Sequence, residues 1–178
     1  MMKNNTIATG LGLLGVISAV AANPLKIGDK APDFTLKNEA GTEFTLSTQL
    51  KESKVALLFY RSGNWWPPCK KQLVELQSGV ENIKKEKAVL WAINFDTPET
   101  LKTVKSDLNI TFPLLSDAGS KIIDTYGVRN KEKDGTDQEG LAKPTIFILD
   151  KEGKITATFA YESVGKRHGS EDIIKALK

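Results

Sequence analysis

Three uninterrupted apolar runs restrict the possible folds of this chain most strongly. They are VALLFY at 55–60, AVLWAINF at 88–95 and PTIFILD at 144–150. Short runs without alternation are typical of strands that helices cover on both faces. Helical spacing of apolar residues follows the Pro67–Pro68 pair and returns after Asp96, so we predict a helix whose first turn holds Pro67 and another that Asp96 caps. The fold class predicted is α/β, with a mixed central sheet flanked by helices.

Weaker patterns complete the order of elements. Alternation at 34–36 and 44–46, around Gly41, predicts an N-terminal β-hairpin. FPLLSD at 112–117 predicts a short strand, and GSKIIDTYGV at 119–128 predicts a short helix. KITATFAY at 154–161 alternates and should be antiparallel to its neighbour, and Ser170 should cap a last amphipathic helix. Residues 129–143, including Arg129 and Lys131–Lys133, should form a solvated surface loop.

The first 22 residues differ from the rest of the chain. Lys3 precedes an apolar run at 7–22 that ends in small residues, AVAA at 19–22. This pattern is typical of a secretory signal peptide cleaved after Ala21 or Ala22, and an uncleaved anchor is the alternative. We therefore expect residues 1–22 to be a signal peptide and residues 23–178 to form a single domain. The mature protein should be periplasmic or secreted, without stable membrane association.

Composition excludes several function classes. The formal charge of +3 is spread among mixed basic and acidic residues, so no nucleic-acid groove is expected. With one histidine, His168, and one cysteine, Cys69, the chain has no cluster of metal-ligand spacing and no basis for a His-based triad. We expect no metal and no cofactor. A single cysteine also excludes an internal disulfide and leaves a thiol that acts alone or with another molecule.

Several sequence pieces together resemble the thioredoxin fold, and more closely its redoxin branch. They are GDKAPDFTL at 28–36, LLFYRSGNWWPPCKKQLVELQ at 57–77, YGV at 126–128, PTIFILDKEGKI at 144–155 and SEDIIKAL at 170–177. These pieces are similar to the alkyl hydroperoxide reductase/thiol-specific antioxidant family, which contains the peroxiredoxins. The resemblance implies an antioxidant thiol oxidoreductase. It also implies that Cys69 occupies the position of the attacking cysteine in the family's Thr-x-x-Cys motif.

Two positions depart from the family pattern. Trp66 stands where peroxiredoxins have threonine and where Cys-x-x-Cys oxidoreductases have their first cysteine. The arginine that peroxiredoxins place before the Phe-x-x-Asp strand is replaced by Pro144, preceded by Lys143. Pro144 instead matches the cis-proline that lies beside the active cysteine in thioredoxins. The sequence thus combines two site patterns.

Cys69 can be interpreted in two ways. In the first turn of a helix, unpaired N–H groups and the helix dipole favour a thiolate, and Lys70, Lys71 and Arg61 add positive charge. A reactive thiol with a lowered pKa follows from this placement. Alternatively, Cys69 lies four residues before Leu73 on the apolar face of the helix and is a small buried hydrophobe.

The neighbours of Cys69 give the other candidate site residues. Arg61 is a candidate catalytic residue that could hold an anion, or it is a surface charge at a strand end. Trp65 and Trp66 either form the wall of the site or serve only in packing. We expect His168 to be a solvated loop residue. A substrate groove is expected from these residues: Trp65, Trp66, Pro67, Pro68, Lys143, Pro144 and Thr145.

Three functions remain open from the sequence. The first is a peroxidase with one cysteine, in which peroxide oxidises Cys69 to sulfenic acid and an external thiol restores it. The second is a relative of thiol-disulfide oxidoreductases that has lost its first cysteine at Trp66 and only binds thiol or disulfide partners. The third is an interaction domain with an inert, buried Cys69.

Overall fold

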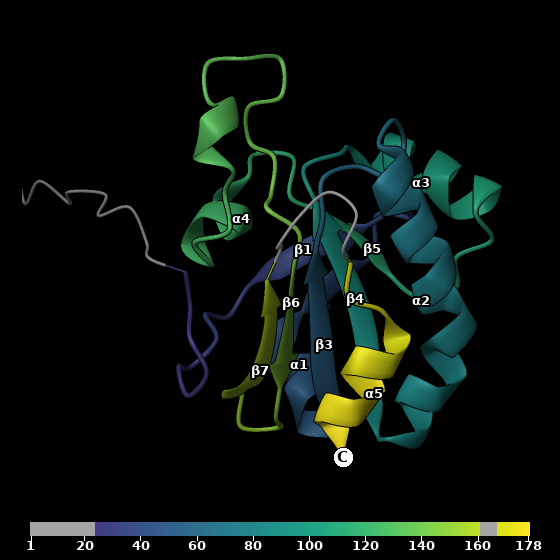
Figure 1. Cartoon of the computed structure of the whole chain (residues 1–178), viewed down its shortest axis with the longest axis vertical. Coiled ribbons are helices and arrows are strands. Elements are labelled where there is room, and N and C mark those ends of the chain that lie inside the picture. Colours follow the sequence, from purple (N-terminus) through teal and green to yellow (C-terminus); the bar gives the residue numbers. More distant parts are fainter. Residues whose placement is uncertain (1–23, 161–166) are drawn as a thin grey trace, which may run out of the picture.

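A computed structural model describes residues 24–160 and 167–178 (Figure 1). Its strands form one seven-stranded mixed sheet in the order β2-β1-β5-β4-β3-β6-β7. The strands are β1 (Thr35–Asn38), β2 (Glu43–Thr45), β3 (Lys54–Phe59), β4 (Ala88–Asn94), β5 (Leu114–Ser116), β6 (Thr145–Leu149) and β7 (Ile155–Ala160). The helices are α1 (Leu46–Glu52), α2 (Pro67–Lys85), α3 (Pro98–Asp107), α4 (Lys121–Thr125), the 3-10 turn η1 (Lys131–Lys133) and α5 (Ser170–Leu177). The predicted α/β fold class is confirmed.

Strand β3 lies inside the sheet and is covered on both faces. It pairs in parallel with β4 and antiparallel with β6. The even-numbered residues of 56–60 belong to one apolar cluster, and the odd-numbered residues of 55–59 belong to a second one. Because successive side chains of a strand point to opposite faces, two cores require an uninterrupted apolar run. This is the physical reason for the VALLFY pattern.

Different helices cover the two faces. Helices α2, α3 and α5 supply one core, for example through Leu73, Val104 and Ile173. Helices α1 and α4, with the segment before β1, supply the other core, for example through Leu50 and Ile123. Figure 1 shows α5 against the sheet next to α2. The site described below lies where α2 and α5 both begin.

The outer strands follow the sequence pattern closely. The predicted hairpin is β1 and β2, with Thr35 opposite Thr45, and β1 also pairs antiparallel with β5. Strand β7 is antiparallel to β6, as its alternation predicted. Residues 1–22, which we expect to be a signal peptide, lie outside the described part of the chain. Within residues 24–160 and 167–178, no helix is long and apolar enough to cross a membrane.

Two predicted helix caps are wrong by one residue. Thr97 caps α3, with its Oγ1 accepting a hydrogen bond from the Thr100 N–H at 3.4 Å. Asp96 instead points into a buried polar cluster next to the candidate site. At α5 the cap is Gly169, and Ser170 is the first helical residue. Helix α1 was not predicted, because it follows β2 directly without a turn signal.

The solvated-loop prediction for 129–143 is only partly right. The η1 turn has no buried residue, but Leu141 and Ala142 are fully buried at the far end of the loop. Arg129 is mostly covered, since its guanidinium contacts three carboxylates. They belong to Asp124, Asp134 and Glu139. Ion pairs therefore hold this loop in place, and the number of its apolar residues does not reveal them.

Candidate functional site

Helix α2 begins where the sequence placed it. Trp66 is the N-terminal cap, Pro67 and Pro68 are the first two helical residues, and Cys69 is the third. Prolines fit there because the first N–H groups of a helix have no partner within it. The Cys69 N–H already bonds to the Trp66 carbonyl at 2.9 Å. Cys69 is therefore held in the first turn of α2, at the end of the turn that follows β3.

The environment of the Cys69 thiol differs from the predicted one. Its side chain is fully buried and belongs to the core between α2 and the sheet. Burial raises the pKa of the Cys69 thiol above its ordinary value. The prediction of a lowered pKa is therefore wrong for this conformation. The prediction fails because the Cys69 side chain points inward. Its sulfur lies between the helix and the sheet and not at the solvated end of the helix.

Four groups nevertheless favour the thiolate. Hydrogen bonds from the backbone of Arg61 and Ser62 lower the pKa of Cys69, and so do the charges of Arg167 and Arg61. Their combined effect is smaller than that of desolvation. The sulfur thus lies in a desolvated pocket in which four groups stabilise negative charge, and an apolar core alone would not supply them.

A buried polar cluster fixes the turn that faces the sulfur. The Ser62 hydroxyl donates to Oδ2 of Asp96 at 2.8 Å, and the Asn94 side-chain amide donates to the same oxygen at 2.5 Å. Ser62 Oγ also accepts the Asn64 N–H at 3.0 Å. Burial raises the pKa of Asp96 while these two side chains lower it. The cluster supports the turn at residues 61–64, whose backbone lowers the pKa of Cys69 through Arg61 and Ser62.

Arg61 and the two tryptophans form a second cluster beside this turn. The Arg61 guanidinium carbon lies 5.0 Å from the centre of the Trp66 ring, a cation–π distance. Trp66 packs partly against the core, whereas Trp65 is 38 % exposed and meets Trp66 edge to face. Trp66 thus both packs and borders the site. Arg61 is not a lone surface charge, because it stacks on Trp66 and acts on the thiol.

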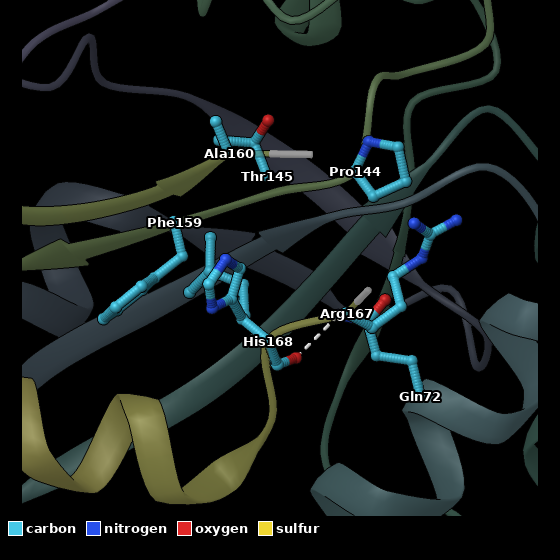
Figure 2. A pocket seen from close by; sticks show the side chains of 8 residues that line it. Gln72, Pro144, Thr145, Phe159, Ala160, Arg167 and His168 are labelled. Atoms are coloured by element: carbon cyan, nitrogen blue, oxygen red, sulfur yellow. Dashed lines mark hydrogen bonds between the residues drawn. The ribbon is translucent and has the colours of Figure 1, made fainter. Parts of the chain in front are cut away.

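Arg167 is a site residue that the sequence analysis missed. It lines a small cavity with Gln72, Pro144 and Thr145, and Figure 2 shows its guanidinium between Pro144 and Gln72. The cavity has about 10 Å³ of free space, close to what one water molecule needs. Arg167 follows β7 and precedes α5, far from Cys69 in sequence. No local motif could have predicted that its charge reaches the sulfur.

Helix α2 holds the segment that carries Arg167. The Gln72 side-chain amide donates to the His168 carbonyl at 2.9 Å. The Glu75 carboxylate accepts the Ser170 N–H at 3.1 Å and the Ser170 hydroxyl at 2.7 Å. His168 is not a solvated loop residue, since its Nδ1 lies 2.9 Å from an Asp172 carboxylate oxygen and its ring packs on Phe159. The start of α5 is thereby fixed to the helix that carries the thiol.

The predicted substrate groove is divided in the structure. Pro144 and Thr145 line the small cavity, while Pro67 and Pro68 line a larger groove, and Arg167 lines both. Lys143 points elsewhere, with its Nζ 3.6 Å from a Glu132 carboxylate oxygen.

The cis-proline expectation for Pro144 is wrong. Residues 24–160 and 167–178 contain no cis peptide bond, so the Lys143–Pro144 bond is trans. Pro144 therefore matches the thioredoxin proline in its position at the start of β6, but not in its backbone geometry.

No metal centre is found in the described ranges, where no three His, Cys, Asp or Glu side chains gather as metal ligands. The groups around Cys69 are instead two backbone amides, two guanidiniums and a ring of apolar side chains. Such a set can stabilise a thiolate or an oxygen anion bonded to sulfur. It cannot supply an internal disulfide, because the chain has one cysteine.

Comparison with known proteins agrees with this geometry. Residues 27–158 match the model of the AhpC/TSA family. Peroxiredoxin Bcp of Escherichia coli (strain K12) is 31 % identical over 138 residues, which cover 77 % of this chain and 86 % of that protein. The thiol-disulfide oxidoreductase ResA of Bacillus thuringiensis (strain Al Hakam) is 30 % identical over 132 residues, covering 74 % and 68 %.

A solved structure supports the same fold. The crystal structure of peroxidoxin BcpB from Mycobacterium tuberculosis superposes with a TM-score of 0.77 at 24 % identity, covering 86 % of this chain and 96 % of that one. At this identity the likeness shows the thioredoxin-like fold alone. Together with the family match, it places the chain in the AhpC/TSA family, and relatives such as Bcp make it peroxiredoxin-like at a general level.

Proposed function

We propose that this protein is a thiol peroxidase that reduces peroxides through Cys69 alone. The observation that carries the proposal is the set of groups around the sulfur. Two backbone amides and two guanidiniums surround a thiol in the first turn of a helix. Apolar packing does not require any of these groups, whereas an anionic sulfur does.

The proposed reaction transfers an oxygen to sulfur. The Cys69 thiolate attacks one peroxide oxygen, the O–O bond breaks, and the leaving alkoxide or hydroxide takes a proton. Sulfur becomes sulfenic acid, and water or an alcohol is released. Arg61 and Arg167 would stabilise the charge that passes from sulfur to the leaving oxygen. An external thiol then reduces the sulfenic acid, because this chain has no second cysteine.

Trapping of the sulfenic acid tests this function. Hydrogen peroxide should give a dimedone adduct at Cys69, and Cys69→Ser should give none. Because Trp66 lacks the hydroxyl of the family's threonine, we expect a rate below that of peroxiredoxins that have it. A thiol that reacts with peroxide no faster than free cysteine would rule out the peroxidase.

A second candidate is a disulfide-binding relative of thiol-disulfide oxidoreductases. The likeness to ResA favours it, together with Trp66 at the first position of a Cys-x-x-Cys motif. Trp66→Cys tests it, because Trp66 is only partly buried and its loss should be tolerated. The variant should form a 66–69 disulfide and reduce insulin with dithiothreitol, while the parent should not. A folded variant that forms the disulfide but leaves insulin intact would exclude this candidate.

We also propose that the protein is exported, with cleavage after Ala21 or Ala22. The support is the apolar run at 7–22 with its small terminal residues. Intact mass of protein secreted by an exporting host should correspond to a start at Ala22 or Asn23. Recovery of the chain with Met1 or Met2 still attached would contradict export by this route.

A further inference from the structure

A groove opens between the first turns of α2 and α5, next to the buried thiol. Its lining includes Pro67, Pro68, Lys71, Arg167, Glu171 and Asp172, and its volume is about 680 Å³. Sites for small molecules typically measure about 300–1,000 Å³. A stable protein partner covers roughly 800 Å² on each side, which requires a broad surface and not a single groove. The groove is therefore of a size for one small ligand.

Charges of both signs face this groove. Lys71 on α2 and Arg167 are positive, while Glu171 and Asp172 in the first turn of α5 are negative. Lys71 and Glu171 are exposed, and neither forms an ion pair within the described ranges. A ligand with a carboxylate and an ammonium group could satisfy both ends, whereas a purely apolar ligand could satisfy neither.

Two side chains, those of Gln72 and Arg167, connect the groove with the small cavity beside Pro144. Gln72 follows Cys69 by three residues on the same buried face of α2, and it lines both the groove and the small cavity beside Pro144. Arg167 also lines both, as its position next to Gln72 in Figure 2 illustrates. The buried Oε1 of Gln72 has no hydrogen-bond partner among the described residues. A ligand in the groove thus contacts two side chains that also line the small cavity, and the charge of one of them, Arg167, acts on the Cys69 thiol.

We propose that this groove binds the reductant of Cys69, and that the reductant is a small zwitterionic thiol of amino-acid or peptide type. The proposal rests on the peroxidase function proposed above. The thiol sulfur attacks the Cys69 sulfenic acid, an S–S bond forms, and the hydroxyl leaves as water with the thiol's proton. A second thiol molecule then displaces the Cys69 thiolate, giving free disulfide and restoring Cys69.

The test measures hydrogen peroxide turnover of the mature chain with two small reductants and, separately, with the protein dithiol thioredoxin. Glutathione, a thiol peptide with one ammonium and two carboxylates, is the charged reductant, and dithiothreitol is the uncharged reference. Lys71→Gln and Glu171→Gln should each lower kcat/KM for glutathione about twofold to fivefold relative to dithiothreitol, as expected for a partly exposed ion pair. Lys84→Gln and Glu81→Gln are matched controls at the other end of α2, and they should leave this ratio unchanged.

Three outcomes would overturn one or both proposals in distinguishable ways. If dithiothreitol supports turnover but neither Lys71→Gln nor Glu171→Gln changes the ratio, the groove does not bind the reductant. If only a protein dithiol such as thioredoxin supports turnover, the reductant is not a small thiol. If no reductant supports peroxide consumption, the peroxidase function itself falls, and the groove proposal with it.

Discussion

The contact between α2 and α5 should not tolerate even one methyl group at Gly79. A Cβ at this position would overlap the Cβ and Oγ of Ser170, the first residue of α5. Because the Ser170 Cβ is fixed to the backbone, no rotamer change relieves the overlap and α5 must shift. Overpacking of this kind costs about 2–3 kcal/mol. Alanine gains about 1 kcal/mol over glycine in a helix. Gly79→Ala should therefore lower the free energy of unfolding by about 1–2 kcal/mol.

Urea and thermal denaturation measure this loss directly. For a domain of this size the melting temperature should fall by about 2–8 °C. Gly119→Ala is the matched control, since nothing lies within 4 Å of its added Cβ, and it should stay within about 0.5 kcal/mol of the parent.

A second substitution isolates the contact. Ser170→Gly removes the atoms that the new methyl meets, so Gly79→Ala should cost at least about 1 kcal/mol less in that background. If Gly79→Ala has the same cost with either residue at 170, or no cost at all, the packing argument is refuted.

Three further substitutions test other contacts in the protein. Glu75→Ala leaves the Ser170 N–H and hydroxyl without their carboxylate and should lower the free energy of unfolding by about 1–3 kcal/mol in urea denaturation. The control Glu81→Ala, at an exposed position, should lower it by less than about 0.5 kcal/mol, and equal losses would contradict the contact. Arg61→Gln removes a cation that lowers the pKa of Cys69, so the pH midpoint of Cys69 alkylation should move up; an unchanged midpoint would show that Arg61 does not act on the thiol. Burial raises the pKa of Asp117 from 3.8 to about 6, so the folded state binds more protons than the unfolded chain between these values, and stability should fall as pH rises from about 4 to about 6. Asp117→Asn should flatten this slope, and a slope that persists would assign it to another group.

The sheet and its main helices could be predicted because their causes are local. The apolar run of β3 follows from burial on both faces, and the start of α2 follows from the special position of Pro67 and Pro68. The predicted helix caps, Asp96 and Ser170, each lie one residue from the observed caps. A polar side chain near the start of a helix can either cap the helix or bond elsewhere. Asp96 bonds to Ser62, which is 34 positions away and which no local pattern could identify.

The site was less predictable because it depends on contacts between elements that are far apart in the sequence. The position of Cys69 in the helix was evident, but the direction of its sulfur depends on how α2 rests on the sheet. Gln72 and Glu75 bind His168 and Ser170, which follow Arg167 directly, and these contacts across helices hold Arg167 near the site. The trans bond before Pro144 likewise depends on backbone context that a single aligned proline does not specify.

Complete burial of Cys69 has a kinetic consequence. A reagent can reach the sulfur only while the first turn of α2 or the start of α5 is displaced. Each measured rate constant is therefore the rate constant of the accessible thiol multiplied by the fraction of molecules in the open conformation. A conformation open about 1 % of the time would slow every reagent about a hundredfold. At high concentration, reaction outpaces reclosing and the opening step becomes rate-limiting. Peroxides and alkylating reagents of very different reactivity should then converge on one common plateau rate.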